Sequence, residues 1–316
     1  MRVGGVFIEH PILQAGMAGG LSGARLAAAV SSAGGLGTVG MLGAEPLERE
    51  LSAAKARTER PVAVNLLLPF LRRAHLRAAR VADIIVTFWG PPRRLGPQPW
   101  FHQAGSVAEA RAALDAGADA VILQGSEAGG HVRGERSALE LLAAARRALP
   151  GGARLIVAGG VAGADDVRRA LDGGADAVSL GTRFLLSEES GAHPLYKARV
   201  LASERTLVTT LFGMGWPAPH RVVPNLATSR FHPPPRWLGA VHRASAALAR
   251  LVPLDAAGAA ARWHSAERPL YSPSAPLVGD PDALIDAAPL YAGESARRID
   301  AVLPAAELVR ELLRGR

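Results

Sequence analysis

Short, mostly apolar runs recur along the first part of the chain, and each is followed by a helical pattern or a turn. Their positions are apolar consecutively rather than alternately, which is typical of strands buried on both faces of a parallel sheet. Eight such runs are present, at 11–17, 36–41, 61–68, 82–89, 99–105, 119–125, 153–160 and 176–182. Between them, segments rich in Ala and Leu predict helices at 23–33, 45–57, 107–116, 137–148 and 165–172.

Eight strand–helix units in about 200 residues predict an α/β fold of the TIM (β/α)8 barrel type rather than an open doubly wound sheet. The barrel wall is expected to be abbreviated around strands 3–5. The segment after residue 68 allows only a short helix, and GPPRRLGPQ (90–98) has prolines and glycines where the next helix would lie. Part of the barrel is therefore expected to lack its outer layer.

The pattern changes after residue 205. Proline-rich stretches at 215–225 and 231–237 predict irregular backbone, and 237–265 is typical of a helix. Pro304 followed by apolar residues at helical spacing predicts a closing helix. We therefore divide the chain into a barrel at 1–205, a helical lid or substrate subdomain at 206–290, and a C-terminal segment and helix at 291–316 that return to the barrel.

Composition excludes several classes of function. The net charge is +8, but the basic residues are scattered arginines apart from Lys55 and Lys197, so nucleic-acid binding is not expected. The chain has no cysteine, which excludes disulfides, thiolate metal sites and cysteine nucleophiles. The apolar runs have strand length, and Glu9 and His10 interrupt the amino-terminal segment, so we expect no membrane span or signal peptide and a cytoplasmic location.

Glycines cluster where four predicted strands end, in QAGMAGG (14–20), QGSEAGGH (124–131), AGGV (158–161) and GTRF (181–184). The carboxyl ends of barrel strands are the face that carries active sites. Gly159, Gly160 and Gly181 would let backbone N–H groups approach a phosphate, and the Thr182 hydroxyl can add a donor. Arg183 is near enough to add positive charge unless its side chain points elsewhere.

Other familiar sites are absent from the sequence. It contains no Walker A motif, no GxGxxG after the first strand, no GxSxG, and no HExxH or HxH spacing among its histidines. No metal site is therefore predicted. Asn65 ends an apolar strand, where a buried amide requires partners, so we interpret it as a ligand-binding residue. These observations favour a phosphorylated cofactor lying across a barrel mouth.

The sequence resembles the nitronate monooxygenases, which were formerly called 2-nitropropane dioxygenases and are FMN-dependent TIM barrels. The resemblance rests on PILQAGMAGGLSGARLAAAVSSAGGLGTVG (11–40), VNLLLP (64–69), AGADAVILQGSEAGGH (116–131), VAGGVAGADDVRRAL (157–171), ADAVSLGTRFL (175–185), PLYAGESARRI (289–299) and LPAAELVREL (303–312). These motifs span most of the chain.

The resemblance implies that His131 is the catalytic residue and that FMN is the cofactor. The implied cofactor-binding residues are Ala15, Gly16 and Met17 beside the ring, Asn65 at its pyrimidine edge, Gln124 and Gly129 facing it, and Gly159, Gly160, Gly181 and Thr182 at the phosphate. A histidine whose pKa lies near neutral pH can remove the acidic C–H proton beside a nitro group, and the redox chemistry belongs to FMN.

The function implied is oxidation of small alkyl nitronates by O2 to a carbonyl compound and nitrite. An alternative is an FMN- and NAD(P)H-dependent reductase of an enoyl thioester or a quinone, and a third is a scaffold protein without flavin. The expected partners are a small-molecule substrate and O2, and the expected assembly is a homodimer. We interpret Glu127 as structural and Trp216, Trp237 and Trp263 as part of the lid core, and we explain His193 and Lys197 equally well by helix capping or a lid hinge.

Overall fold

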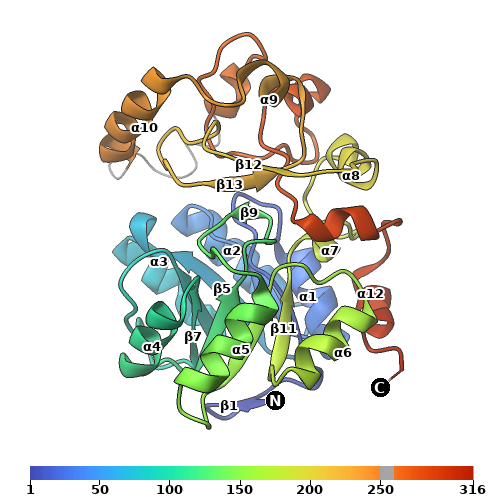
Figure 1. The fold of residues 1–316 in the computed structure, drawn as a ribbon. Coiled ribbons are helices and arrows are strands. Elements are labelled where there is room, and N and C mark those ends of the chain that lie inside the picture. The colour runs from blue at the N-terminus through green and yellow to red at the C-terminus, as the bar shows by residue number, and fades with distance from the viewer. Residues whose placement is uncertain (250–259, 316) are drawn as a thin grey trace.

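The computed structural model describes residues 1–249 and 260–315, and the predicted barrel is confirmed (Figure 1). Eight parallel strands hydrogen bond in the order β3-β11-β10-β8-β7-β6-β5-β4. Their bounds are β3 Ile12–Gln14, β4 Gly37–Val39, β5 Val62–Leu67, β6 Ile84–Phe88, β7 Trp100–Ala104, β8 Ala120–Gln124, β10 Leu155–Ala158 and β11 Ala177–Leu180.

The two outermost strands, β3 and β4, are also the shortest and meet at a single parallel bridge between Leu13 and Leu36. The Gln14 side chain strengthens this seam, because its Oε1 accepts a hydrogen bond from the Thr38 N–H at 2.9 Å. The Gln14 N–H in turn donates to the Leu36 carbonyl at 2.9 Å. A fully buried amide thus supplies pairing that two three-residue strands could not provide alone.

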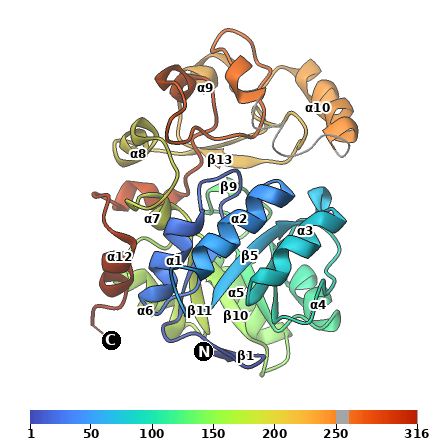
Figure 2. The same cartoon turned by 180° about the vertical axis from the view of Figure 1, so that it is seen from behind.

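Helices surround this barrel as predicted, and Figure 2 shows α1, α2 and α3 on the side opposite to Figure 1. Their bounds are α1 Ala24–Ser32, α2 Ala44–Lys55, α3 Arg73–Ala78, α4 Val107–Asp115, α5 Ala138–Ala148, α6 Ala164–Asp172 and α12 Ala305–Leu312. The abbreviated wall is confirmed, since α3 has six residues and the described segment between β6 and β7 contains no helix. The closing helix α12 buries Leu308 and Leu312 in the core shared with α1 and α6.

A short hairpin closes the amino-terminal end of the barrel. It comprises β1 (Arg2–Val3) and β2 (Val6–Phe7), and it lies at the bottom of the barrel in Figure 1. Val3 and Ile8 pack there with the inward-facing Leu13 and Phe101. The opposite end of the barrel, where the strands terminate in glycines, faces the rest of the chain.

A second layer covers that end (Figure 1). It contains a three-stranded antiparallel sheet in the order β12 (Leu207–Thr209), β13 (His220–Val222), β9 (Gly130–His131). It also contains α7 (Thr182–Leu185), α8 (Pro194–Leu201), α9 (Leu226–Phe231), α10 (Arg236–Ala249) and the 3₁₀ helices Ala260–Trp263, Asp282–Asp286 and Glu294–Arg298. Strand β9 belongs to the loop after β8, so the barrel itself contributes one strand of the covering sheet.

The helix predicted over 237–265 is present only in part. Helix α10 covers its first half, residues 250–259 lie outside the described residues, and Ser265 forms an antiparallel bridge with Arg268. The prediction of a continuous helix is therefore wrong at its carboxyl end. The tryptophans predicted as lid core also differ, because Trp237 is 52% and Trp263 is 88% exposed. Among residues 1–249 and 260–315, no helix combines the length and the apolar character that crossing a bilayer requires.

We expect the fold to lose stability in mild acid. Burial lowers the pKa of His102 and of His220 to about 4. Because these folded-state values lie below the ordinary value near 6.5, unfolding takes up protons between about pH 6.5 and pH 4, and stability falls as pH falls through that window. The effect is on the order of 3 kcal/mol at most for each histidine. Urea unfolding near pH 7 and near pH 5 measures this loss of stability. If the free energy of unfolding of His102→Gln fell between these pH values as much as that of the wild type, the contribution of His102 would be refuted.

Candidate active site

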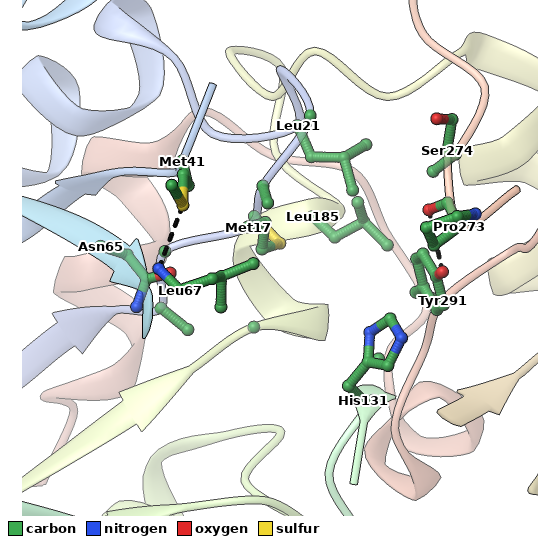
Figure 3. A pocket seen from close by; sticks show the side chains of 18 of the residues that line it. Met17, Leu21, Met41, Asn65, Leu67, His131, Leu185, Pro273, Ser274 and Tyr291 are labelled. Atoms are coloured by element: carbon green, nitrogen blue, oxygen red, sulfur yellow. Dashed lines mark hydrogen bonds between the residues drawn. The ribbon is translucent and has the colours of Figure 1, made fainter. Parts of the chain in front are cut away.

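A cavity of about 1080 Å³ lies between the carboxyl ends of the barrel strands and the covering layer (Figure 3). All eleven predicted site residues line it, namely Ala15, Gly16, Met17, Asn65, Gln124, Gly129, His131, Gly159, Gly160, Gly181 and Thr182. They come from five segments that are far apart in the sequence. This volume is slightly above the usual range for small-molecule pockets, about 300–1,000 Å³, so it has room for a cofactor together with a substrate.

The tips of β10 and β11 offer backbone without side chains. Gly159 and Gly160 have φ values of +111° and +73°, which non-glycine residues rarely adopt. Gly181 faces open space, because the heavy atom nearest to an added Cβ is the Cβ of Ala15 at 3.9 Å. The Thr182 hydroxyl accepts a hydrogen bond from the Gly293 N–H at 2.9 Å, and its own proton remains available to a ligand.

Arg183 does not extend this group. Its side chain is buried and donates through Nη1 to the Ala301 carbonyl at 2.9 Å. The guanidinium therefore ties α7 to the C-terminal segment, and the sequence-based suggestion that it adds charge beside the glycines is not supported. At the tip of β10 the Arg298 guanidinium donates to the Gly160 carbonyl and to Asp166, so a cation that the sequence reasoning did not single out lies near these glycines.

Asn65 presents a side-chain amide to the cavity. Its side chain is 4% exposed, lines the cavity and has no hydrogen-bond partner among the described residues. A buried amide without partners costs free energy unless a ligand or water supplies them. Gly16 lies directly against Asn65, because a Cβ on Gly16 would overlap the Asn65 Cβ and contact its Cγ. The amide is therefore held at the cavity wall beside bare backbone.

Gln124 holds the loop that carries His131. Its Nε2 donates to the His131 carbonyl at 3.0 Å, and its Oε1 accepts from the Arg133 N–H at 2.9 Å. Gly129 serves the same loop, since an added Cβ would lie 2.5 Å from the backbone nitrogen of Gly293. Both residues line the cavity, but these contacts show that they also fix the loop against its neighbours.

We expect Gln124→Leu to destabilise the fold by about 1–3 kcal/mol, because it leaves one buried carbonyl and one N–H of the His131 loop without partners. Gln124→Glu is the matched control, since a carboxylate can still accept from the Arg133 N–H. Urea unfolding of both variants near pH 7 measures the difference. Equal stability of wild type and Gln124→Leu would contradict this role.

His131 lies inside a box of aromatic rings. Strand β9 pairs with β13 so that His131 is opposite His220, and their ring centroids are 5.2 Å apart. The Trp216 indole stacks on the imidazole, with centroids 3.6 Å apart and an interplanar angle of 13°. Tyr291 and Trp89 complete the box at 5.8 Å and 6.3 Å. Trp216 was predicted as lid core, and it is instead the stacking partner of His131.

The imidazole of His131 is held in its neutral form. Burial, and secondarily the neighbouring His220, lower the pKa of His131 well below its ordinary value. Its Nε2 is fully buried and has no hydrogen-bond partner among the described residues. The expectation of a pKa near neutral pH therefore needs correction, because the box removes the water that would stabilise an imidazolium.

Three further residues have structural contacts. Both carboxylate oxygens of Glu127 accept from the Ala138 N–H at the start of α5, at 3.2 and 3.0 Å, as we predicted for a structural acid. His193 accepts from the Leu195 N–H at 3.2 Å and caps α8. Lys197 donates to the Ser187 carbonyl at 2.6 Å. The His193 contact favours capping over a hinge, whereas the Lys197 contact ties α8 to the loop after α7.

Sequence reasoning missed several residues that line the cavity or contact His131. Trp89 has φ +60°, which is rare for a bulky residue, and its indole Nε1 is buried without a partner among the described residues. Tyr291 and Gly293 return to the cavity from the C-terminal segment. The motif PLYAGESARRI contains both, but no local pattern indicates that this motif meets the His131 loop.

Comparison with known proteins adds to this geometry. The family model for nitronate monooxygenase matches residues 3–89 and 100–315. A nitronate monooxygenase of Pseudomonas aeruginosa is 32% identical over 269 residues, which cover 65% of this chain and 75% of that protein. A second relative is a 5-hydroxy-7a-methyl-1-oxo-octahydro-1H-indene-4-carboxyl-CoA dehydrogenase of Mycobacterium tuberculosis, which is 34% identical over 233 residues. The match covers 68% of this chain and 63% of that relative's length.

Two solved structures are similar over nearly the whole chain. FabK from Thermotoga maritima has a TM-score of 0.75 and 27% identity, with 97% of this chain and 92% of that chain covered. A nitroalkane oxidase from Streptomyces ansochromogenes has a TM-score of 0.74 and 29% identity, with 96% and 94% covered. The family match covers far more than half of the chain, so this protein is an oxidoreductase that belongs to the nitronate monooxygenase family.

Proposed function

We propose that this protein oxidises small alkyl nitronates with O2, giving a carbonyl compound and nitrite, and that FMN is its cofactor. One observation carries the proposal. A neutral histidine whose Nε2 is buried without a hydrogen-bond partner lines the same cavity as an unpartnered amide and two glycine-lined strand tips. The names of the Pseudomonas aeruginosa relative and of the Streptomyces ansochromogenes structure agree with this reaction.

The residues present fit FMN. The unpartnered Asn65 amide suits the pyrimidine edge of a flavin, which carries both donors and acceptors. Gly159, Gly160 and Gly181 leave backbone open where a phosphate would bind, and Thr182 has a hydroxyl proton to donate. Ala15, Gly16 and Met17 would pass the ring, with Gln124 and Gly129 holding the loop that closes over it. When bound, FMN supplies the electron transfer that none of these side chains can perform.

His131 would act on the substrate as a base. A neutral imidazole can accept the C–H proton next to a nitro group, and the electron pair of the broken bond remains on the resulting nitronate. The aromatic box excludes water from the ring, so the proton does not exchange with solvent during transfer. A nitronate supplied as the anion does not need this step.

Spectra and product analysis test the proposal. We expect the purified protein to be yellow, or to become so with added FMN, and to release nitrite from a nitronate in the presence of air. A colourless protein that takes up no flavin would refute the cofactor. A flavin-containing protein that releases no nitrite would refute the reaction while leaving the cofactor in place.

An NAD(P)H-dependent reductase is the second candidate. It is favoured by the similarity to FabK and to a CoA-thioester dehydrogenase, and by a cavity large enough for a second sizeable ligand. Anaerobic mixing with NADH or NADPH separates the two functions. Rapid bleaching of the flavin supports the reductase, and an unbleached flavin together with nitrite release supports the monooxygenase.

The covering layer would serve as a lid. We propose that residues 206–290 cover the substrate and that 291–316 return the chain to the barrel wall. The contacts of Trp216 with His131 and of α12 with the barrel core support this division. The cytoplasmic location and the homodimer stay predictions.

A further inference from the structure

His131 lacks the partner that a histidine base usually has. In many enzymes a carboxylate or a carbonyl oxygen accepts a hydrogen bond from the second ring nitrogen and stabilises the imidazolium. Among residues 1–249 and 260–315, no carboxylate pairs with His131 and no group hydrogen bonds to its ring. A proton accepted from a substrate would therefore place an uncompensated charge in a buried site.

The titratable groups around the ring do not supply a negative charge. His220 on β13 is held in one tautomer, because Nδ1 can only donate to the Ala218 carbonyl at 2.9 Å, whereas Nε2 accepts from the Phe212 N–H at 3.3 Å. The Tyr291 hydroxyl donates to the Pro273 carbonyl at 2.9 Å, and burial raises its pKa. Arg133, two residues along the chain, places its guanidinium 5.0 Å from the Trp89 ring centroid, and it is a cation.

The π face of the Trp216 indole is the remaining group that can stabilise a positive charge on the His131 ring. An indole carries negative potential on its faces and attracts cations placed within about 6 Å of the ring centroid. The Trp216 and His131 rings are nearly parallel at 3.6 Å, which is well inside that range. Burial keeps the imidazole neutral at rest, and this contact lowers the free energy of its protonated form relative to the same ring without Trp216.

Trp216 is held in this position from both layers. Its backbone N–H donates to the Gly213 carbonyl at 2.9 Å, and the preceding Gly215 N–H donates to the Ser245 hydroxyl of α10 at 2.9 Å. On the barrel side the indole meets Phe70 and Trp89 edge to face, with centroids 5.3 Å and 5.5 Å apart. The Trp216 side chain, which belongs to the covering layer, is therefore held in place by contacts with the barrel.

We propose that Trp216 is a positioning residue that orients the His131 ring and stabilises its protonated form through a cation–π contact, in place of a carboxylate. The inference rests on the proposed function, in which the C–H bond beside a nitro group breaks, its electron pair stays on the nitronate, and the proton moves to a ring nitrogen of His131.

Titration of His131 tests the inference without turnover. We compare Trp216→Leu, which removes the π face, with Trp216→Phe, which keeps a smaller one, by NMR of the flavin-loaded protein, and we assign the signal from its loss in His131→Asn. We expect proton affinity to fall about 3- to 30-fold in Trp216→Leu and by less in Trp216→Phe. Trp237→Leu on α10 is the matched control, since Trp237 is largely exposed, and it should leave the titration unchanged.

Kinetics give a second readout. Trp216→Leu should slow proton removal from a neutral nitroalkane by about 3- to 30-fold while leaving oxidation of the preformed nitronate near the wild-type rate. Unchanged His131 titration in both Trp216 variants would overturn the inference. A shifted titration in a protein that oxidises neither substrate would uphold the contact and refute the proposed function instead.

Discussion

His131→Asn is expected to lower kcat/KM for a neutral nitroalkane by about 10²- to 10⁴-fold, the range that a general base contributes. Asparagine cannot accept the proton, but it keeps a polar side chain of similar reach on β9. The flavin should stay bound, because the predicted cofactor contacts are made by other residues. Steady-state nitrite release at several nitroalkane concentrations, with the flavin spectrum of each preparation, measures both effects.

The preformed nitronate provides the internal control for this variant. Its oxidation does not require removal of the C–H proton, so its rate should fall far less than that of the neutral nitroalkane. Equal losses on both substrates would mean that the substitution damages the site in general. Undiminished turnover of the neutral compound would remove His131 from the reaction.

Gly181→Asp is expected to weaken FMN binding by 100-fold or more. The position is open to a side chain, since the nearest heavy atom to an added Cβ is 3.9 Å away, and its φ of −95° suits any residue. The new carboxylate would face the phosphate, and opposed like charges cost several kcal/mol, with each 1.4 kcal/mol equal to about tenfold in affinity. Fluorescence titration of the flavin-free protein with FMN measures the change.

Gly181→Asn is the matched control, because it has nearly the same shape as aspartate without the charge. It should retain most of the affinity for FMN. Riboflavin, which has no phosphate, should bind wild type and Gly181→Asp with similar affinity. If the aspartate and asparagine variants lose FMN equally, the loss is steric and the phosphate does not bind at the tip of β11.

Both expectations depend on the way the two layers meet. The strand tips predicted to bind the cofactor belong to the barrel, whereas the His131 ring is enclosed by side chains from β13, the 213–217 loop and the C-terminal segment. A variant in one layer can therefore alter flavin binding or proton transfer separately. This separation is what allows spectra and rates to be interpreted independently.

Local patterns in the sequence were sufficient to predict the architecture of the barrel. Consecutive apolar residues predicted all eight barrel strands, and the prolines of 90–98 predicted the missing helix, because strand burial and backbone restriction act over a few neighbouring residues. Glycines at strand ends predicted one shared mouth, since parallel strands all end on the same side. The eleven predicted site residues meet in one cavity for that reason.

The tertiary structure alone decided what surrounds His131. Trp216, His220 and Tyr291 lie 85 or more positions away along the chain, since they follow residue 131 by 85, 89 and 160 residues, and nothing in their neighbourhoods indicates that they enclose it. Strand β9 pairs with a strand from the covering layer only once both layers have folded. The barrel and its glycine-lined mouth could be predicted without the structure, because they follow from local periodicity. The charge state of the imidazole depends on burial by distant segments, which only the folded chain brings together.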